Sequence, residues 1–171
     1  MGTVRKEHKT FRILLVDDHP LFRRGLEDVV KQDPRLQIVH HADCAASGLE
    51  AFQEVGPDLV VTDLSFADSS GLTLIRRLRD LPSKCPILVL SMHEESFWAE
   101  QVLQCGANGY IQKDADIRTV IDAIHKTAAG DIYLSNPMQQ KVLRQISGLA
   151  ENNTPLQVLS RRELEIFQYI A

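Results

Sequence analysis

Cysteine and long apolar runs are both scarce in this sequence, and each scarcity excludes a class of protein. The three cysteines, Cys44, Cys85 and Cys105, are odd in number and far apart. Neither a disulfide framework nor a zinc site is therefore expected, and we interpret them as free buried thiols. No apolar run approaches the roughly 20 residues that cross a bilayer. The short basic N-terminus also lacks the apolar segment of a secretory signal. These absences predict a cytoplasmic protein with no membrane partner.

Excess positive charge is also missing. Nineteen lysines and arginines stand against 23 acidic residues, for a formal net charge of −4. This balance gives no support for a nucleic-acid-binding surface in the sequence at hand. The 171 residues suit one ordinary domain plus a smaller part, and 44% hydrophobic residues are ample for a packed core.

Short apolar runs alternate with helical patterns between residues 11 and 130. Runs rich in β-branched residues and bounded by turn residues are typical of strands buried on both faces. Five strands alternating with five helices predict an α/β fold, a (βα)5 doubly wound parallel sheet with helices on both faces. The strands are expected at 11–16, 36–41, 58–63, 86–90 and 109–111, and the helices at 20–32, 45–54, 72–81, 97–105 and 115–128. Asp114 is the expected cap of the last helix.

This alternation stops after residue 130. Apolar residues at helical spacing predict one more helix at 137–149, within a helical linker spanning 131–158. That helix is either an interdomain connector, a dimer contact or a helix docked on its own domain. Ser160 and Glu163 then form a capping box before a short apolar face. Residues 159–171 are too few to pack alone, so we expect them to be the truncated start of an all-α domain.

Polar residues follow four of the predicted strands. Asp17 and Asp18 follow the first strand, Asp63 ends the third, Ser91 follows the fourth and Lys113 follows the fifth. A single aspartate at a strand end is usually a helix cap or turn former. Here, however, the carboxyl ends of parallel strands meet at one edge, where open α/β sheets bind ligands. The sequence therefore predicts that these side chains converge.

A phosphoryl-transfer site would explain this set of side chains. Carboxylates in one pocket disfavour joint ionisation, so at least one raised pKa is expected. A hard cation such as Mg²⁺ relieves that repulsion and keeps positions free for a phosphoryl oxygen. Asp63 is then a candidate nucleophile that forms an acyl phosphate. Lys113 can hold a phosphoryl oxygen as a compact charge, and Ser91 offers a hydroxyl.

Several motifs carry a family resemblance. They are LVDDHP at 15–20, Asp63, Gly71, Ser91 and GYIQK at 109–113. With these motifs, residues 11–130 resemble the flavodoxin-like receiver domain of two-component response regulators. Residues 159–166, LSRRELEI, resemble the opening of a LuxR-type helix-turn-helix. Together the two matches resemble a NarL/FixJ-type transcription regulator.

The resemblance implies a role for each site residue. Asp63 would be the phosphoacceptor for a sensor histidine kinase. Asp18, Asp63 and the backbone carbonyl of Ser65 would bind Mg²⁺, with Asp17 acting nearby or through water.

The switch would follow from phosphorylation. Ser91 would turn to hydrogen-bond the phosphoryl group, Tyr110 would rotate inward into the space that Ser91 leaves, and Lys113 would pair with the phosphoryl oxygens. The full-length protein would then dimerise and bind DNA to control transcription.

Two other functions remain open from the sequence. A phosphatase with an aspartyl-phosphate intermediate commonly has a second aspartate two residues after its nucleophile, but Ser65 stands there. An interaction module that has lost the chemistry is also conceivable, although every required residue type is present. His19 is interpreted as a helix-start residue rather than a ligand. Trp98 is either packing beneath its helix or part of a surface that reads the switch.

Overall fold

The computed structural model describes residues 9–67 and 69–146. Five parallel strands form one sheet in the order β2-β1-β3-β4-β5, which confirms the predicted doubly wound arrangement. Their bounds are β1 (Phe11–Val16), β2 (Leu36–Ala42), β3 (Leu59–Asp63), β4 (Ile87–Ser91) and β5 (Gly109–Gln112). Since β1 and β3 lie side by side, the ends that carry Asp17 and Asp63 are neighbours.

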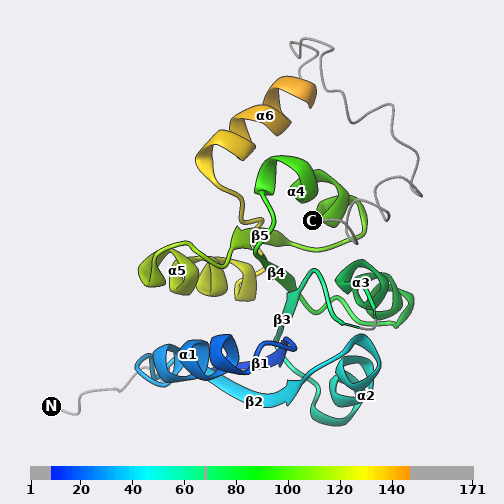
Figure 1. Ribbon diagram of the computed structural model, residues 1–171, viewed down its shortest axis with the longest axis vertical. Coiled ribbons are helices and arrows are strands. Elements are labelled where there is room, and N and C mark those ends of the chain that lie inside the picture. Colours follow the sequence, from blue (N-terminus) through cyan, green and yellow to red (C-terminus); the bar gives the residue numbers. More distant parts are fainter. Residues whose placement is uncertain (1–8, 68, 147–171) are drawn as a thin grey trace, which may run out of the picture.

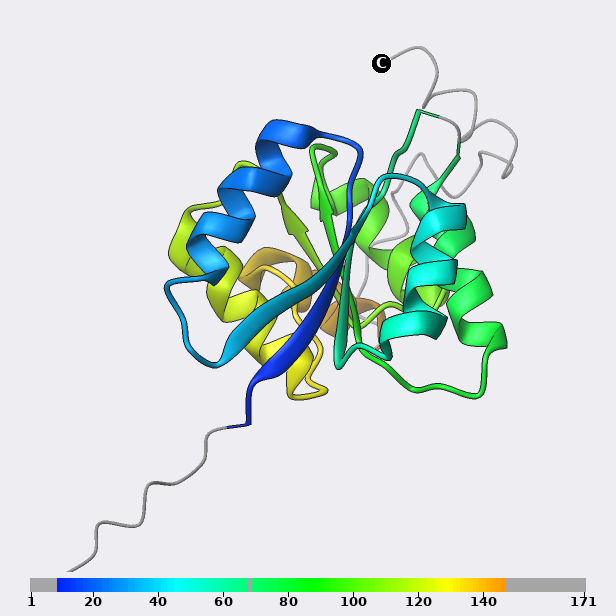
Figure 2. The ribbon, with the colours of Figure 1, turned by 90° about the horizontal axis from the view of Figure 1, so that it is seen from below.

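Helices cover both faces of the sheet (Figures 1 and 2). One layer contains α1 (Pro20–Val30) and α5 (Ile117–Ala128), and the other contains α2 (Ala45–Val55), α3 (Gly71–Asp80) and α4 (Glu95–Gln104). Alternate strand residues bury against each layer. Val60 belongs to the core beneath α2, α3 and α4, whereas Leu59 and Val61 belong to the core beneath α1 and α5. Every residue of β3 is buried, as its apolar run predicts.

Two helix starts differ from the sequence prediction. Asp114 does not cap α5; instead Asp116 Oδ1 accepts hydrogen bonds of 3.0 Å from both Arg118 N and Thr119 N. Asp116 lies directly before the first helical residue, where a carboxylate reaches the free amides of the first turn. Helix α4 begins at Glu95, two residues before the predicted start.

A sixth helix, α6 (Asn136–Ile146), lies within the predicted linker. It lies against α4, so it is docked on its own domain (Figure 1). The segment that leads into it forms a parallel bridge between Tyr133 and Gly109 of the edge strand β5. The predicted helix-turn-helix start at 159–171 and the rest of the linker lie outside the described residues.

The amino ends of β4 and β5 are fastened by one side chain. Arg79 on α3 donates hydrogen bonds to Gly106 O at 2.8 Å, Cys85 O at 2.9 Å and Asn108 Oδ1 at 3.1 Å. These acceptors stand after α4, before β4 and before β5. Arg79 therefore joins the end of α4 to the starts of β4 and β5, at the opposite edge of the sheet from Asp63.

The three cysteines are free and partly buried, close to the interpretation from their spacing. Throughout the described part of the chain, no helix has the length and apolarity to cross a membrane.

Candidate functional site

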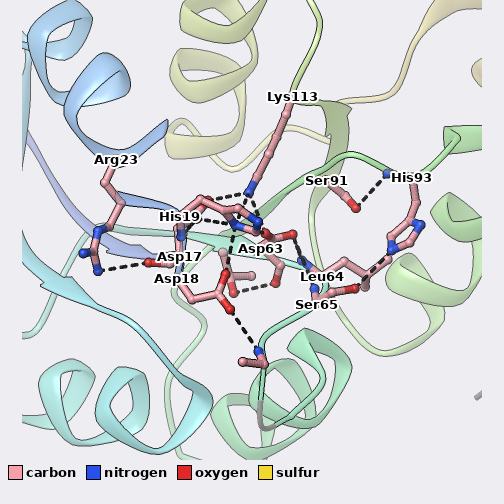
Figure 3. A network of polar contacts seen from close by, with 12 residues as sticks. Asp17, Asp18, His19, Arg23, Asp63, Leu64, Ser65, Ser91, His93 and Lys113 are labelled. Carbon is pink, nitrogen blue, oxygen red and sulfur yellow. Dashed lines mark hydrogen bonds and ion pairs between the residues drawn. The ribbon is translucent and has the colours of Figure 1, made fainter. Parts of the chain in front are cut away.

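Asp63 lies buried at the carboxyl end of β3, where two kinds of contact fix its carboxylate (Figure 3). Its Oδ1 accepts hydrogen bonds from Leu64 N at 2.6 Å and Ser65 N at 3.4 Å. Its Oδ2 lies 2.5 Å from Lys113 Nζ, which is also 2.7 Å from Asp17 Oδ2. Side chains from three strand ends therefore meet, as the sequence predicts.

A cluster of ligand atoms surrounds this contact. One such atom from each of Asp17, Asp18, His19 and Asp63 lies within 4.8 Å of the others. Among the described residues, the buried oxygens Asp17 Oδ2 and Asp18 Oδ1 accept no hydrogen bond of regular geometry, although each has a nitrogen at ion-pair distance. Carboxylate oxygens aimed into one small space are the donor set that hard divalent cations prefer. These residues therefore fit a magnesium ion.

His19 lies at the start of α1, as the sequence interpretation expects, and its side chain also reaches the acidic cluster. It occupies the cap position of α1, but its side chain makes no capping hydrogen bond. Instead its Nδ1 lies 2.9 Å from Asp18 Oδ1, 3.2 Å from Asp17 Oδ1 and 3.4 Å from Asp63 Oδ2. The interpretation as a helix-start residue is confirmed, and the structure adds the contacts of the ring with the carboxylates. Its place directly after two clustered aspartates was the available signal.

The electrostatics of the pocket oppose ionisation of Asp63. Burial raises the pKa of Asp63 above its usual value, and the nearby charge of Asp17 acts in the same direction. The hydrogen bond and charge of Lys113 oppose that rise without cancelling it. The predicted raised pKa is thus found, but its main cause is desolvation rather than repulsion between carboxylates.

His93 connects the two residues expected to report phosphorylation. Its backbone N donates to Ser91 Oγ at 3.2 Å, and its carbonyl accepts a 2.8 Å hydrogen bond from the Tyr110 hydroxyl. The Tyr110 ring is fully buried, and this burial raises the pKa of Tyr110 to about 12. The ring therefore already occupies an inward position.

The His93 side chain makes two further contacts. Its Nε2 lies 3.1 Å from Ser65 Oγ, which joins the loop after β3 to the loop after β4 (Figure 3). Its ring centroid lies 5.7 Å from that of Trp98 on α4. The site loop is further fastened by Asp18 Oδ2, which accepts a 2.9 Å hydrogen bond from Ala67 N.

Comparison with known proteins agrees with this geometry. Residues 13–125 match the response regulator receiver domain. The chain is 30% identical over 165 residues to the nitrate/nitrite response regulator protein NarP of Escherichia coli K12, covering 96% of this chain and 76% of that protein. It is 34% identical over 160 residues to the transcriptional activator protein ExaE of Pseudomonas putida, covering 93% and 75%.

A solved structure shows the same fold. The crystal structure of a LuxR-family two-component response regulator from Aurantimonas sp. SI85-9A1 has a TM-score of 0.75 and 31% identity, covering 81% of this chain and 99% of that one. The profile match, the relatives and the fold agree. The chain belongs to the two-component response regulators of the LuxR family, with a receiver domain at residues 13–125.

Proposed function

We propose that Asp63 accepts a phosphoryl group from a sensor histidine kinase and that this modification controls transcription by the full-length protein. One observation carries the proposal. The Asp63 carboxylate is held between two backbone amides and Lys113, beside the carboxylates of Asp17 and Asp18. Phosphoryl transfer requires mainly positioning and charge neutralisation, and this arrangement supplies both.

In the proposed step, an Asp63 carboxylate oxygen forms a bond to phosphorus while the bond between phosphorus and the kinase histidine nitrogen breaks. Asp63 must act as the anion, so a neighbouring positive charge favours the reactive form. Lys113 supplies that charge and stays near enough to pair with a phosphoryl oxygen afterwards.

A magnesium ion would be held by Asp18, Asp63 and the Ser65 carbonyl, with Asp17 nearby or bound through water. When bound, it would neutralise charge on the phosphoryl oxygens. The buried oxygens Asp17 Oδ2 and Asp18 Oδ1, which lack regular hydrogen bonds, support this assignment.

The reporting residues are Ser91 and Tyr110. Ser91 would exchange its contact with His93 N for one with the phosphoryl group, while Tyr110 would retain its inward position. Phosphorylation would thereby stabilise one of two arrangements of the loop after β4.

Response regulators are signalling proteins, and we propose that this one has no multiple-turnover activity of its own. It would act in the cytoplasm, form homodimers on activation and bind DNA only as the full-length protein. Its receiver domain would span 11–130, its helical linker 131–158 and the start of its LuxR-type helix-turn-helix 159–171.

Phosphorylation from a small donor tests the proposal. After incubation with acetyl phosphate and Mg²⁺, intact mass spectrometry should show one added phosphate on the wild-type chain. Asp63→Asn should remain unlabelled, and removal of Mg²⁺ with a chelator should abolish labelling. Asp58→Asn is the matched control, since Asp58 precedes the opposite end of the same strand. Equal labelling of Asp63→Asn and wild type would refute the assignment, as would a wild-type chain that takes up no phosphate.

A further inference from the structure

Helix α6 is bound to α4 by apolar packing. Met138 on α6 is 3% exposed, and Leu134, just before the helix, is 4% exposed. Both belong to the same buried cluster as Trp98, Ala99 and Val102 on α4. Burial of apolar side chains favours the docked position. Helix α6 is therefore continuous with the core rather than a free connector.

Polar contacts fasten α6 to the first two turns of α4. Ser135 N donates a 2.8 Å hydrogen bond to Glu95 Oε1. Lys141 Nζ donates to Ser96 O at 3.0 Å and lies 3.1 Å from Glu100 Oε1. Residues on both sides of the start of α6 thus hold the beginning of α4.

The segment before α6 is also bonded to the backbone of Tyr110. Tyr110 N donates to Tyr133 O, and Tyr133 N donates to Asn108 O, both at 3.0 Å. Gly109 permits this close approach, since a Cβ there would lie 3.0 Å from Tyr133 O and 3.1 Å from Tyr133 Cβ. The segment therefore extends the sheet beside the strand that carries Tyr110.

These contacts meet at two residues, His93 in the loop before α4 and Glu95, the first residue of α4. The His93 carbonyl accepts a hydrogen bond from the Tyr110 hydroxyl, and His93 N donates one to Ser91 Oγ. The Glu95 carboxylate accepts a hydrogen bond from Ser135 N, just before α6. Tyr110 is held by the same segment through its backbone. A displacement of the loop at His93 must therefore strain the contacts of α6, and release of α6 must loosen that loop.

We infer that residues 132–146 and helix α4 form one switch, in which docking of α6 and the inward position of Tyr110 stabilise each other. The inference rests on the proposed function in one respect: phosphorylation at Asp63 strengthens α6 docking through His93. Because docked α6 favours the arrangement that accepts the phosphoryl group, release of α6 lowers the population of that arrangement and should slow labelling.

The first test does not require phosphorylation. Tyr110→Phe removes the hydroxyl that holds His93 O and should raise amide hydrogen exchange in 136–146 by about fivefold, the effect of losing about one hydrogen bond. The single tryptophan, Trp98, provides a second measurement. In Tyr110→Phe its indole ring should become more accessible, so a soluble quencher should reduce its fluorescence more than in wild type. Unchanged exchange in 136–146 would overturn the inference.

The second test measures labelling by acetyl phosphate. Lys141→Glu should slow labelling by roughly fivefold, the upper range for a partly exposed ion pair. The charge-swapped double variant, Lys141→Glu with Glu100→Lys, should recover most of the wild-type rate. Lys31→Glu is the matched control, since it breaks the Lys31–Glu27 pair at the end of α1, on the other face of the sheet from α4, with the same change in charge.

The outcomes separate the two proposals. If Lys141→Glu raises α6 exchange but is labelled as fast as Lys31→Glu, the coupling is refuted and phosphorylation of Asp63 stands. If the wild-type chain is not labelled at all, the proposed function fails, and the exchange of Tyr110→Phe alone decides whether α6 and Tyr110 are coupled.

Discussion

At the scale of single residues, the burial of Asp63 lowers the stability of the fold at the pH where the carboxylate must be ionised to react. Its pKa is raised in the folded chain, so folding is favoured most when it is protonated and stability is lost as pH rises through that pKa. Asp63→Asn removes this loss. The variant should therefore be more stable than wild type at neutral pH by about 1 kcal/mol, a common scale for single substitutions. Thermal unfolding at pH 7 should show it, and the gain should shrink at acidic pH.

The pKa of Asp58 is shifted in the opposite direction to that of Asp63. Although burial opposes it, the hydrogen bond from Arg12 N and the contact with Lys9 lower the pKa of Asp58. A lowered pKa contributes stability above the unfolded value that is lost as pH falls through the folded one. Asp58→Asn should therefore destabilise the chain at pH 7, and less so in acid. If Asp63→Asn and Asp58→Asn changed the stability at pH 7 in the same direction, this electrostatic account would be contradicted.

His19 shows where the sequence was insufficient at this scale. The convergence of Asp17, Asp18, Asp63 and Lys113 could be predicted, because strand ends in a parallel sheet share one edge. The direction of the His19 ring could not be predicted, because the side chain of a residue at a helix start can point to the pocket or to solvent with the same backbone.

At the scale of elements, Gly71 sets how closely α3 approaches the end of β3. A Cβ at Gly71 would lie 2.1 Å from Asp63 O and 2.9 Å from Leu64 Cα. Both are backbone atoms, so the helix or the site loop must shift. Gly71→Ala should cost about 1–3 kcal/mol, as overpacked sites do, and should slow labelling of Asp63. Denaturant unfolding and mass spectrometry measure the two effects.

Gly25 is the control for that substitution. It lies within α1, and a Cβ there would meet nothing within 4 Å. Alanine costs less backbone entropy than glycine in a helix, so Gly25→Ala should stabilise the chain by about 0.5–1 kcal/mol. Destabilisation by both substitutions would show that the close approach at Gly71 is not the cause.

The elements themselves could be predicted well from periodicity. All five strands and their helices appear where apolar runs and helical spacing place them. The docking of α6 could not be predicted, because its apolar stripe suits any apolar partner. Contacts such as Ser135 to Glu95 join residues forty positions apart, and only the folded chain reveals them. The cap at Asp116 was missed because Asp114 offers the same side chain two residues earlier.

At the scale of the whole molecule, two switch elements keep apolar surface exposed. Phe97 on α4 is 53% exposed and Leu143 on α6 is 58% exposed. If phosphorylation fixes these elements in one position, it also fixes the surface that a second copy would meet. Light scattering after gel filtration should show the mass shifting towards that of a dimer after treatment with acetyl phosphate. Asp63→Asn should keep the untreated mass, and an identical shift in this variant would exclude phosphorylation as the cause.

The three hydrogen bonds of Arg79 hold the carboxyl end of helix α4 more firmly than its amino end. Its carboxyl end is tied through Gly106 O to two other elements, whereas its amino end follows the loop in which His93 N donates to Ser91 Oγ. If phosphorylation displaces that loop, we expect α4 to turn about its carboxyl end near Gly106. The displacement would then be largest at Glu95, where the segment before α6 is attached. A shift of the loop at His93 would therefore reach α6, while the amino ends of β4 and β5 held by Arg79 would stay in place.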